Sequence, residues 1–570
     1  MKTGMRKGLT SYGDSEFSLF LRKAFIKAMG YSDEALDLPV IGIVNTYSGY
    51  NPCHGNVPEL IEAIRRGVML SGGLPVDFPT ISLHESFSHP TSMYLRNLMA
   101  MDTEEMIRAQ PMDAVVLIGG CDKTVPAQLM AAASANVPAI SVVSGPMLSG
   151  THGAERVGAC TDCRRYWGMH RAGDVDEAEI NQISGELVPS VGFCGVMGTA
   201  STMACMTEAL GMMLPGGASI PAVAAERKRH AEAAGRRAVQ LAAEGLTPDK
   251  IMTPEAFANS LRILMAIGGS TNGIVHMTAV AGRLGIEVDL DAFDRMGLET
   301  PVLVDLKPSG MNYMDDFDKA GGLRVVMREI KHLLNLDCLT VSGKTLGEEI
   351  EAAPEPWPQN VVRPLADPIN ASGGITVLRG NLAPRGAIFK QSAADPALQT
   401  HTGRAVVFDS LEDMSNRIDA PDLDVTRDDI LVLRNAGPIG APGMPEAGYI
   451  PIPRKLAEQG VKDMVRMSDA RMSGTAFGSI VLHICPEAAV GGPLSLVQTG
   501  DQISLDVPNR SLKLLVDEAE LEKRKATWEA PVSSEGERGY RKLFLDHVQQ
   551  ADEGCDMDYL TSRPFTARTP

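Results

Sequence analysis

One stretch of the chain reads Ala114-Val115-Val116-Leu117-Ile118-Gly119-Gly120-Cys121-Asp122-Lys123-Thr124, an apolar run that ends in two glycines followed by a thiol, a carboxylate and an amine. The β-branched run is typical of a buried strand, and Pro126 then opens a helix. The same order occurs upstream, where the apolar run 40–44 is followed by a polar loop and a helix from Pro58. Strand, loop and helix at this spacing predict a parallel α/β sheet.

Two further apolar runs fit the same sheet, at residues 76–81 and 139–143. Ligands of open parallel sheets bind beyond the carboxyl ends of the strands. The loops that follow the predicted strands contain Cys53, Glu85 and the triplet from Cys121 to Lys123. We therefore expect the functional site at this edge of the sheet.

The pattern changes after residue 353. Five prolines fall between residues 354 and 368, which favours an extended linker. Beyond it, short predicted strands are separated by Gly, Pro and Asp turns, at 374–379, 404–408, 430–434, 480–484 and 512–516. We expect an α/β protein with a mainly parallel N-terminal domain at 1–365 and a β-rich C-terminal domain at 366–570, either a barrel or a sandwich.

The net charge of the chain argues against some classes of binding partner. The chain has 570 residues, with 53 Lys and Arg against 71 Asp and Glu, and a net charge of −18. This surplus argues against nucleic acid or an anionic membrane as a partner. No apolar run approaches the length of a membrane span, and no signal-peptide pattern opens the chain, so we expect a cytoplasmic protein. An anionic substrate would need a metal ion or a local basic pocket.

Nine cysteines are too sparse for a disulfide scaffold in a chain of this length. Cys53, Cys121 and Cys194 lie in loops rich in glycine or polar residues, where the backbone can approach a bulky inorganic group. Three thiolates suit an iron–sulfur centre with one iron position open to substrate. Spacing alone leaves the alternative of buried, inert thiols open.

The compact motif Cys160-Thr161-Asp162-Cys163 could be redox-active or half of a zinc site. No second pair lies at zinc-finger spacing, which favours a structural or incidental role. His54 and His84 flank the candidate loops, and we expect both to be hydrogen-bonding neighbours rather than ligands.

Glu85, Asp122 and Glu446 are loop carboxylates of the kind that Mg²⁺ prefers, although a loop acid can equally be a solvated surface group. Glu446 ends a loop rich in glycine and proline, 437–446. The loop 468–475 reads Ser-Asp-Ala-Arg-Met-Ser-Gly-Thr and lacks the glycine spacing of a hydrolase nucleophile elbow. Its Arg471 could clamp a substrate carboxylate.

Together these segments resemble the family of dihydroxy-acid and sugar-acid dehydratases (IlvD/Edd). The matching segments run in family order over nearly the whole chain: Asn51-Pro52-Cys53-His54, residues 119–124, Gly268-Gly269-Ser270-Thr271-Asn272, residues 378–384, Pro442-Gly443-Met444-Pro445-Glu446 and residues 468–474.

The resemblance implies a [2Fe–2S] cluster held by Cys53, Cys121 and Cys194, with [4Fe–4S] as the alternative. It also implies a Mg²⁺ site formed by Glu85, Asp122, Glu446 and a carbamylated Lys123. The implied fold is an α/β/α domain followed by a β-barrel, assembled as a homodimer or homotetramer.

After Glu446 the chain continues Ala447-Gly448-Tyr449-Ile450-Pro451, which resembles the pentonate-type sugar-acid enzymes. The resemblance implies a hydro-lyase that converts an aldonate, such as L-arabinonate or D-xylonate, to the 2-keto-3-deoxy acid. Ser473 is the expected base at C2, and Thr475 and Arg471 are expected to contact substrate. The alternatives are a branched-chain dihydroxy-acid dehydratase and, more distantly, an iron–sulfur redox sensor without catalysis.

Overall fold

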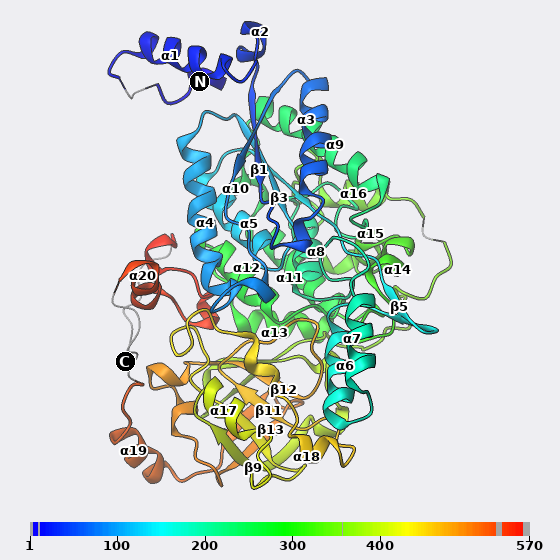
Figure 1. Ribbon diagram of the computed structural model, residues 1–570, viewed down its shortest axis with the longest axis vertical. Helices are drawn as coiled ribbons and strands as arrows, with labels where there is room; N and C mark the ends of the chain where they lie inside the picture. Colours follow the sequence, from blue (N-terminus) through cyan, green and yellow to red (C-terminus); the bar gives the residue numbers. More distant parts are fainter. Residues whose placement is uncertain (1–3, 10–11, 356, 532–537, 563–570) are drawn as a thin grey trace.

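Figure 1 shows the computed structural model, which describes residues 4–9, 12–355, 357–531 and 538–562. The chain forms two halves. The first is rich in helices and is built on a small sheet, and the second is built on a barrel. Of the proline-rich segment 354–368, residue 356 lies outside the described residues. The rest of that segment is irregular apart from a single bridge between Val304 and Val362.

The N-terminal half is built on a four-stranded parallel sheet with the order β2-β1-β3-β4. Its strands are β1 (Val40–Asn45), β2 (Leu74–Pro79), β3 (Ala114–Gly119) and β4 (Ala139–Val143). The four predicted strands are confirmed, although β2 starts two residues earlier than predicted because Leu74 and Pro75 already pair with β1. Strand β3 is buried along its whole length, as a central strand covered on both faces should be.

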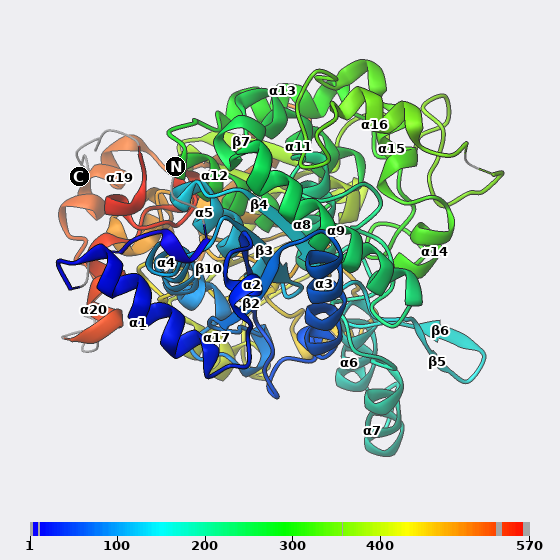
Figure 2. The same ribbon diagram turned by 90° about the horizontal axis from the view of Figure 1, so that it is seen from above.

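Helices cover both faces of this sheet. Helices α3 (Val57–Leu70) and α9 (Ala225–Glu244) lie on one face, and α4 (Ser92–Ala109) and α5 (Thr124–Ala135) lie on the other (Figures 1 and 2). The first pair packs backbone to backbone, since a Cβ on Gly67 would lie 2.0 Å from the carbonyl oxygen of Glu232. Glycine is required at this crossing because no side chain fits.

The strand order places a topological switch between β1 and β3. From β1 the chain moves outward to β2, and it then returns to the opposite side of β1 to form β3 and β4. The loops that leave β1 and β3 therefore diverge and open a crevice at the carboxyl edge of the sheet. This crevice is where the sequence predicted a site.

The remaining elements of this half are helical apart from a short hairpin of β5 (Gly150–His152) and β6 (Glu155–Val157). The helices are α1 (Ser15–Lys27), α2 (Asp33–Leu36), α6 (Thr161–Ala172), α7 (Glu177–Glu186), α8 (Thr199–Ala209), α10 (Pro248–Ile251), α11 (Pro254–Ala266), α12 (Asn272–Arg283), α13 (Leu290–Glu299), α14 (Met314–Lys319), α15 (Leu323–Glu329) and α16 (Leu346–Ala352). Figure 2 shows α6 and α7 projecting from one side of the molecule. Within the described ranges, no helix combines the length and the apolar character that crossing a membrane requires.

The second half is a closed eight-stranded barrel with the order β10-β11-β12-β8-β7-β14-β13-β9. The barrel alternative is therefore confirmed over the sandwich. Its strands are β7 (Thr376–Gly380), β8 (Ala383–Phe389), β9 (Thr400–Phe408), β10 (Ile430–Leu433), β11 (Arg466–Ser468), β12 (Ile480–Cys485), β13 (Gln502–Asp506) and β14 (Ser511–Leu514). Four helices accompany them: α17 (Leu411–Arg417), α18 (Arg454–Ala457), α19 (Glu518–Ala526) and α20 (Gly539–His547).

The C-terminal segment returns to the first half and fastens the two together. Arg283 of α12 forms a fully buried ion pair with Asp556, with Nε 2.5 Å from Oδ2. Arg96 of α4 donates to the carbonyl oxygens of Gly554 and Cys555 at 2.8 and 2.9 Å. The same segment is joined to the barrel, because Arg385 of β8 donates to Asp552 at 2.7 Å. Charge-assisted hydrogen bonds on both sides of the C-terminal segment thus link the sheet half to the barrel.

Candidate active site

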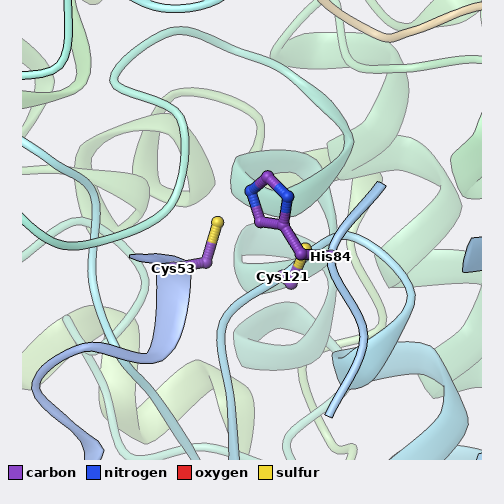
Figure 3. A group of neighbouring side chains, drawn as sticks. All are labelled: Cys53, His84 and Cys121. Carbon is purple, nitrogen blue, oxygen red and sulfur yellow. The ribbon is translucent and has the colours of Figure 1, made fainter. Parts of the chain in front are cut away.

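The loops after β1, β2 and β3 bring two thiols and an imidazole together (Figure 3). Cys53 lies in a short 3-10 turn after β1, and Cys121 follows the two glycines that end β3. Their sulfur atoms and a ring nitrogen of His84 lie within 4.8 Å of one another. Gly120 is required here, because a Cβ at this position would lie 3.0 Å from the carbonyl oxygen of Cys53 and still closer to Ser144.

His54 supports the Cys121 loop as a hydrogen-bonding neighbour, as predicted. Its Nε2 accepts from the backbone N–H of Cys121 at 3.1 Å, so its Nδ1 carries the proton and donates to the carbonyl oxygen of Thr46 at 2.9 Å. Burial lowers the pKa of His54 to about 4. The ring is therefore neutral at physiological pH and fixed in one tautomer.

Cys194 reaches the same crevice from the loop before α8. This loop is fastened to the end of β4 by a hydrogen bond from Phe193 N–H to Gly145 at 3.0 Å. The sulfur of Cys194 lies 3.7 Å from that of Cys160, which directly precedes α6. Cys160, which the sequence reading set aside, is therefore part of the thiol group.

Crowding and burial favour the protonated form of two of these thiols. Contact with Cys121 and then burial raise the pKa of Cys53 well above its usual value, and Cys160 and burial do the same for Cys194. Soft sulfur ligands crowded in a buried, glycine-lined crevice suit an iron–sulfur group. The residues present therefore fit such a cluster.

Three carboxylates form a second group beside the thiols. Oxygen atoms of Glu85, Asp122 and Glu446 lie within 4.8 Å of one another. Glu85 follows β2 and accepts hydrogen bonds from Thr91, at 2.7 Å, and from Ser92. Hard oxygen donors at this separation suit Mg²⁺. The second group therefore fits the predicted metal site.

Two cations balance these carboxylates. Arg471 donates from Nη1 to Glu446 at 2.6 Å and from Nη2 to Glu85 at 3.0 Å. The Lys123 amine is fully buried, hydrogen-bonds Asp122 and lies 3.6 Å from Glu85. Burial by itself would raise the pKa of Glu85, but Arg471 and Lys123 outweigh it and hold that pKa well below the usual range. Three carboxylates against two cations leave one net negative charge, which favours a further cation.

Arg471 lies at the centre of the carboxylate group. Its terminal nitrogens are engaged by Glu446, Glu85 and Thr91, so it positions two candidate metal ligands. Its Nε has no hydrogen-bond partner among the described residues. Contact with substrate stays a prediction for that one nitrogen.

Two buried carboxyls hold the loop that carries Glu446. Glu487 accepts from the backbone N–H groups of Ile439 and Gly440 at 3.0 and 2.8 Å, and Asp469 accepts from Ala436 at 2.9 Å. Burial raises the pKa of Glu487 to about 7 and that of Asp469 to about 6. These residues sit outside the metal group and keep its barrel side rigid.

The Ser473 loop closes the site from the barrel. The Ser473 hydroxyl lies 2.8 Å from that of Thr475, and the Thr475 carbonyl accepts from Thr161 at 3.0 Å. Gly474 packs so closely that a Cβ would lie 2.5 Å from the Cβ of Ser270, in the predicted segment 268–272. A Cβ on Gly198 would contact both Thr475 and Cys194, so the loop borders the thiol group.

Sequence reasoning missed the lysine behind this loop. Lys390 follows β8, is almost fully buried, and donates from Nζ to the Gly474 carbonyl at 3.4 Å. Among the described residues no carboxylate pairs with it, and burial alone acts on its pKa. Burial lowers the pKa of Lys390 to about 7. The sequence signal that could have identified Lys390 is its position directly after the apolar residues 387–389.

Replacing Lys390 by methionine should stabilise the protein most at low pH. The folded state disfavours the charged amine. The free energy by which Lys390 destabilises the fold is therefore greatest below pH 7, and it declines as the pH rises toward the ordinary lysine pKa of 10.5. Lys390→Met should raise the free energy of unfolding at pH 6 by on the order of 4 kcal/mol and by much less near pH 10. Urea unfolding at both pH values measures this. Equal gains at the two values would contradict the assigned protonation.

Comparison with known proteins agrees with this architecture. Residues 38–349 match the family model for the dihydroxy-acid/6-phosphogluconate dehydratase N-terminal domain, and residues 360–555 match its C-terminal counterpart. An L-arabinonate dehydratase of Rhizobium leguminosarum bv. trifolii is 47% identical over 96% of this chain and 95% of its own length. A 6-deoxy-6-sulfo-D-gluconate dehydratase of Pseudomonas putida is 44% identical over 94% of this chain and 93% of its own. A dihydroxy-acid dehydratase of Acetivibrio thermocellus is 39% identical over 94% and 97%. The chain belongs to the dihydroxy-acid/6-phosphogluconate dehydratase family.

Proposed function

We propose that this protein is a sugar-acid dehydratase that removes water from an aldonate to give the 2-keto-3-deoxy acid. The observation that carries the proposal is the adjacency of the two ligand groups. Cys121, Asp122 and Lys123 are consecutive, so one loop joins the thiol group to the carboxylate group. A 2,3-dihydroxy acid needs both at once: hard ligation of its carboxylate end and assistance to the departing C3 hydroxyl.

The thiols of Cys53, Cys121 and Cys194 would hold the iron–sulfur cluster, either [2Fe–2S] or [4Fe–4S]. Glu85, Asp122, Glu446 and a carbamylated Lys123 would hold Mg²⁺. When bound, these groups supply Lewis-acid chemistry at the substrate carboxylate and at the leaving hydroxyl. Carbamylation would turn the Lys123 cation into an anionic oxygen donor, which increases the negative charge offered to the metal ion.

The chain's own residues perform the proton transfer. Ser473, after losing its own proton to solvent, acts as an alkoxide and takes the proton from C2 while the C3–oxygen bond breaks. The departing hydroxide takes this proton from the Ser473 hydroxyl and leaves as water, which regenerates the alkoxide. The resulting enol then tautomerises to the 2-keto acid. Thr475, hydrogen-bonded to Ser473 at 2.8 Å, keeps the serine oxygen oriented. The close packing of Gly474 on Ser270 holds the loop against the sheet half, and the Lys390 amine holds it from the barrel side, so the base is fixed before substrate arrives.

A sugar acid is favoured over a branched-chain acid as the substrate. The relatives at 44–47% identity are named for L-arabinonate and sulfogluconate, whereas the named dihydroxy-acid dehydratase is 39% identical. A redox sensor without catalysis would need neither the three carboxylates nor the serine loop.

The test is a substrate panel. Anaerobically purified enzyme should release 2-keto-3-deoxy acid from L-arabinonate or another aldonate at least tenfold faster than it converts 2,3-dihydroxyisovalerate. A keto-acid assay with mass spectrometry of the products measures both rates. Preference for 2,3-dihydroxyisovalerate would restore the branched-chain alternative.

Asp122→Ala should abolish Mg²⁺-dependent turnover while leaving the visible cluster spectrum in place, because Asp122 belongs to the carboxylate group. Glu104→Ala is a matched control, since Glu104 pairs with Arg108 and Arg283 away from the site. Turnover and absorbance are measured on the same samples, with and without a chelator. Full activity after exhaustive chelation would contradict the metal role.

We also propose a homodimer or homotetramer as the assembly. Size-exclusion chromatography with light scattering distinguishes both from a monomer.

A further inference from the structure

One arginine beside the candidate site has unused hydrogen-bond donors. Arg164 lies near the start of α6 and is partly buried, and its guanidinium forms no hydrogen bond or ion pair with any described residue. Its Nε is buried without an acceptor. The adjacent Arg165 differs, because Asp162 accepts from it at 3.0 Å and Glu155 at 2.8 Å. Since burying a polar group without a partner is unfavourable, Arg164 is suited to binding a ligand.

Arg164 shares a helix face with a thiol of the crevice. Cys160 directly precedes α6 and lies four residues before Arg164, the spacing at which side chains of a helix are neighbours. The backbone N–H of Arg164 donates to the Cys160 carbonyl at 3.3 Å, so the helical turn between them is formed. The Cys160 sulfur lies 3.7 Å from that of Cys194. This face of α6 is therefore turned toward the thiol group.

On its other side Arg164 meets the barrel half. Its guanidinium carbon lies 4.9 Å from the ring centroid of Tyr449, which ends the 3-10 turn Glu446–Tyr449. The Tyr449 ring also packs against an apolar cluster that includes Met472, the neighbour of Ser473. Arg164 thus lies where α6 meets the turn that carries a candidate metal ligand, beside the loop that carries the proposed base.

The other arginines around this turn are already engaged. The guanidinium of Arg466 lies 5.1 Å from the same ring centroid, but it is buried and pairs with Asp463 at 2.8 Å. Arg471 is held by Glu446 at 2.6 Å. Of these three arginines, only Arg164 has no acceptor among the described residues for its terminal nitrogens.

The orientation of the substrate in the proposed function determines which part of it meets Arg164. The carboxylate end lies at the carboxylate group, and the C3 hydroxyl lies at the thiol group. The carbons beyond C3 therefore lead away from the carboxylate group and toward the face of α6 that contacts Cys194. An aldonate carries a hydroxyl on each of these carbons, and hydroxyl oxygens accept from a guanidinium. The branched-chain substrate has only methyl or methylene groups there.

We propose that Arg164 binds the hydroxyl groups of the substrate beyond C3 and so selects an aldonate over a branched-chain acid. The proposal rests on the proposed function, because it requires the substrate to lie across the two ligand groups. The planar guanidinium offers several N–H donors in a fixed arrangement, which suits two neighbouring hydroxyls of a sugar chain. Binding of the substrate carboxylate by Arg164 is the alternative that the test separates.

The test compares wild type, Arg164→Leu and Arg165→Leu on the aldonate that wild type converts fastest. Arg164→Leu should raise KM for this aldonate by roughly 10–100-fold, the range for losing a hydrogen bond to a charged group, while kcat changes much less. Arg165→Leu should leave KM unchanged, because Asp162 and Glu155 occupy its guanidinium. Glycerate, which ends at C3, is measured as a competitive inhibitor. Its inhibition constant should be the same in wild type and Arg164→Leu.

A second measurement applies even if Arg164→Leu folds poorly. Phenylglyoxal, which modifies unpaired guanidinium groups, should label Arg164 of wild type, and saturating aldonate should slow this labelling whereas glycerate should not. Mass spectrometry of peptides measures it.

An unchanged KM in Arg164→Leu, or labelling that the aldonate does not slow, would overturn the contact. An equal loss of glycerate affinity would place Arg164 at the substrate carboxylate and overturn the assigned position. Wild type that converts no aldonate would overturn the proposed function itself, a result that is seen before any variant is compared.

Discussion

Ser473→Ala is expected to lower turnover by roughly 10²–10⁴-fold, the usual contribution of a positioned general base. The Ser473 hydroxyl contacts that of Thr475 within its own loop, and this loop borders the Cys194 segment at Gly198. Exchange of the C2 proton with deuterated solvent should vanish together with turnover. Affinity for substrate should change little, because the carboxylate group remains intact.

Ser468→Ala is the matched control for this loss. Its hydroxyl lies in the same loop but accepts the backbone N–H of Ala470 at 2.9 Å, so it serves local structure. Its removal should leave exchange at C2 close to the wild-type rate. Near-normal exchange in Ser473→Ala would move the base elsewhere, with Thr475 next to be tested.

Cys53→Ser, Cys121→Ser and Cys194→Ser should each remove most of the visible iron–sulfur absorption and of the bound iron. Thiolates are the soft ligands that iron clusters need, and a serine hydroxyl in a buried crevice replaces them poorly. Turnover should fall to background in all three variants. Absorbance and iron content on anaerobically purified protein are the readouts.

Cys338→Ser provides the control, because Cys338 is half-buried and contacts Asn259, away from the thiol group. Its spectrum should match that of wild type. If Cys338→Ser lost its colour while Cys194→Ser kept it, the ligand assignment would be wrong.

The sheet could be predicted from sequence because its strands are buried on both faces. Strands β1, β3 and β4 are short, mainly apolar runs rich in Val and Ile and bounded by loops. The barrel was predicted less completely. Strand β8 has Pro384 and Arg385 near its start, β11 has three residues, and β13 alternates polar and apolar residues, so none stands out as an apolar run.

The candidate site, too, could be predicted only in part. The position of Cys53, Glu85 and Cys121 at strand ends follows from topology, and the family resemblance added Glu446 as an expected metal ligand. The pairing of Glu446 with Arg471 was not predicted. The contact between Cys160 and Cys194 could not be predicted, because the two residues lie on separate segments whose approach depends on the packing of α6 and α8. The burial of Lys390 beside Gly474 could not be predicted either, because it depends on how the barrel closes.

Because both halves contribute residues to the site, one half can change in evolution while the other is kept. The sheet half supplies the thiols, whereas the barrel half supplies Glu446, Arg471 and the Ser473 loop. Mutations in the barrel loops can therefore change the surroundings of the carboxylate group without replacing any of the three cysteines. Grafting residues 437–453 from a relative of different substrate preference is accordingly a rational route to new specificity, with the buried Arg283–Asp556 pair left in place to keep the two halves in register.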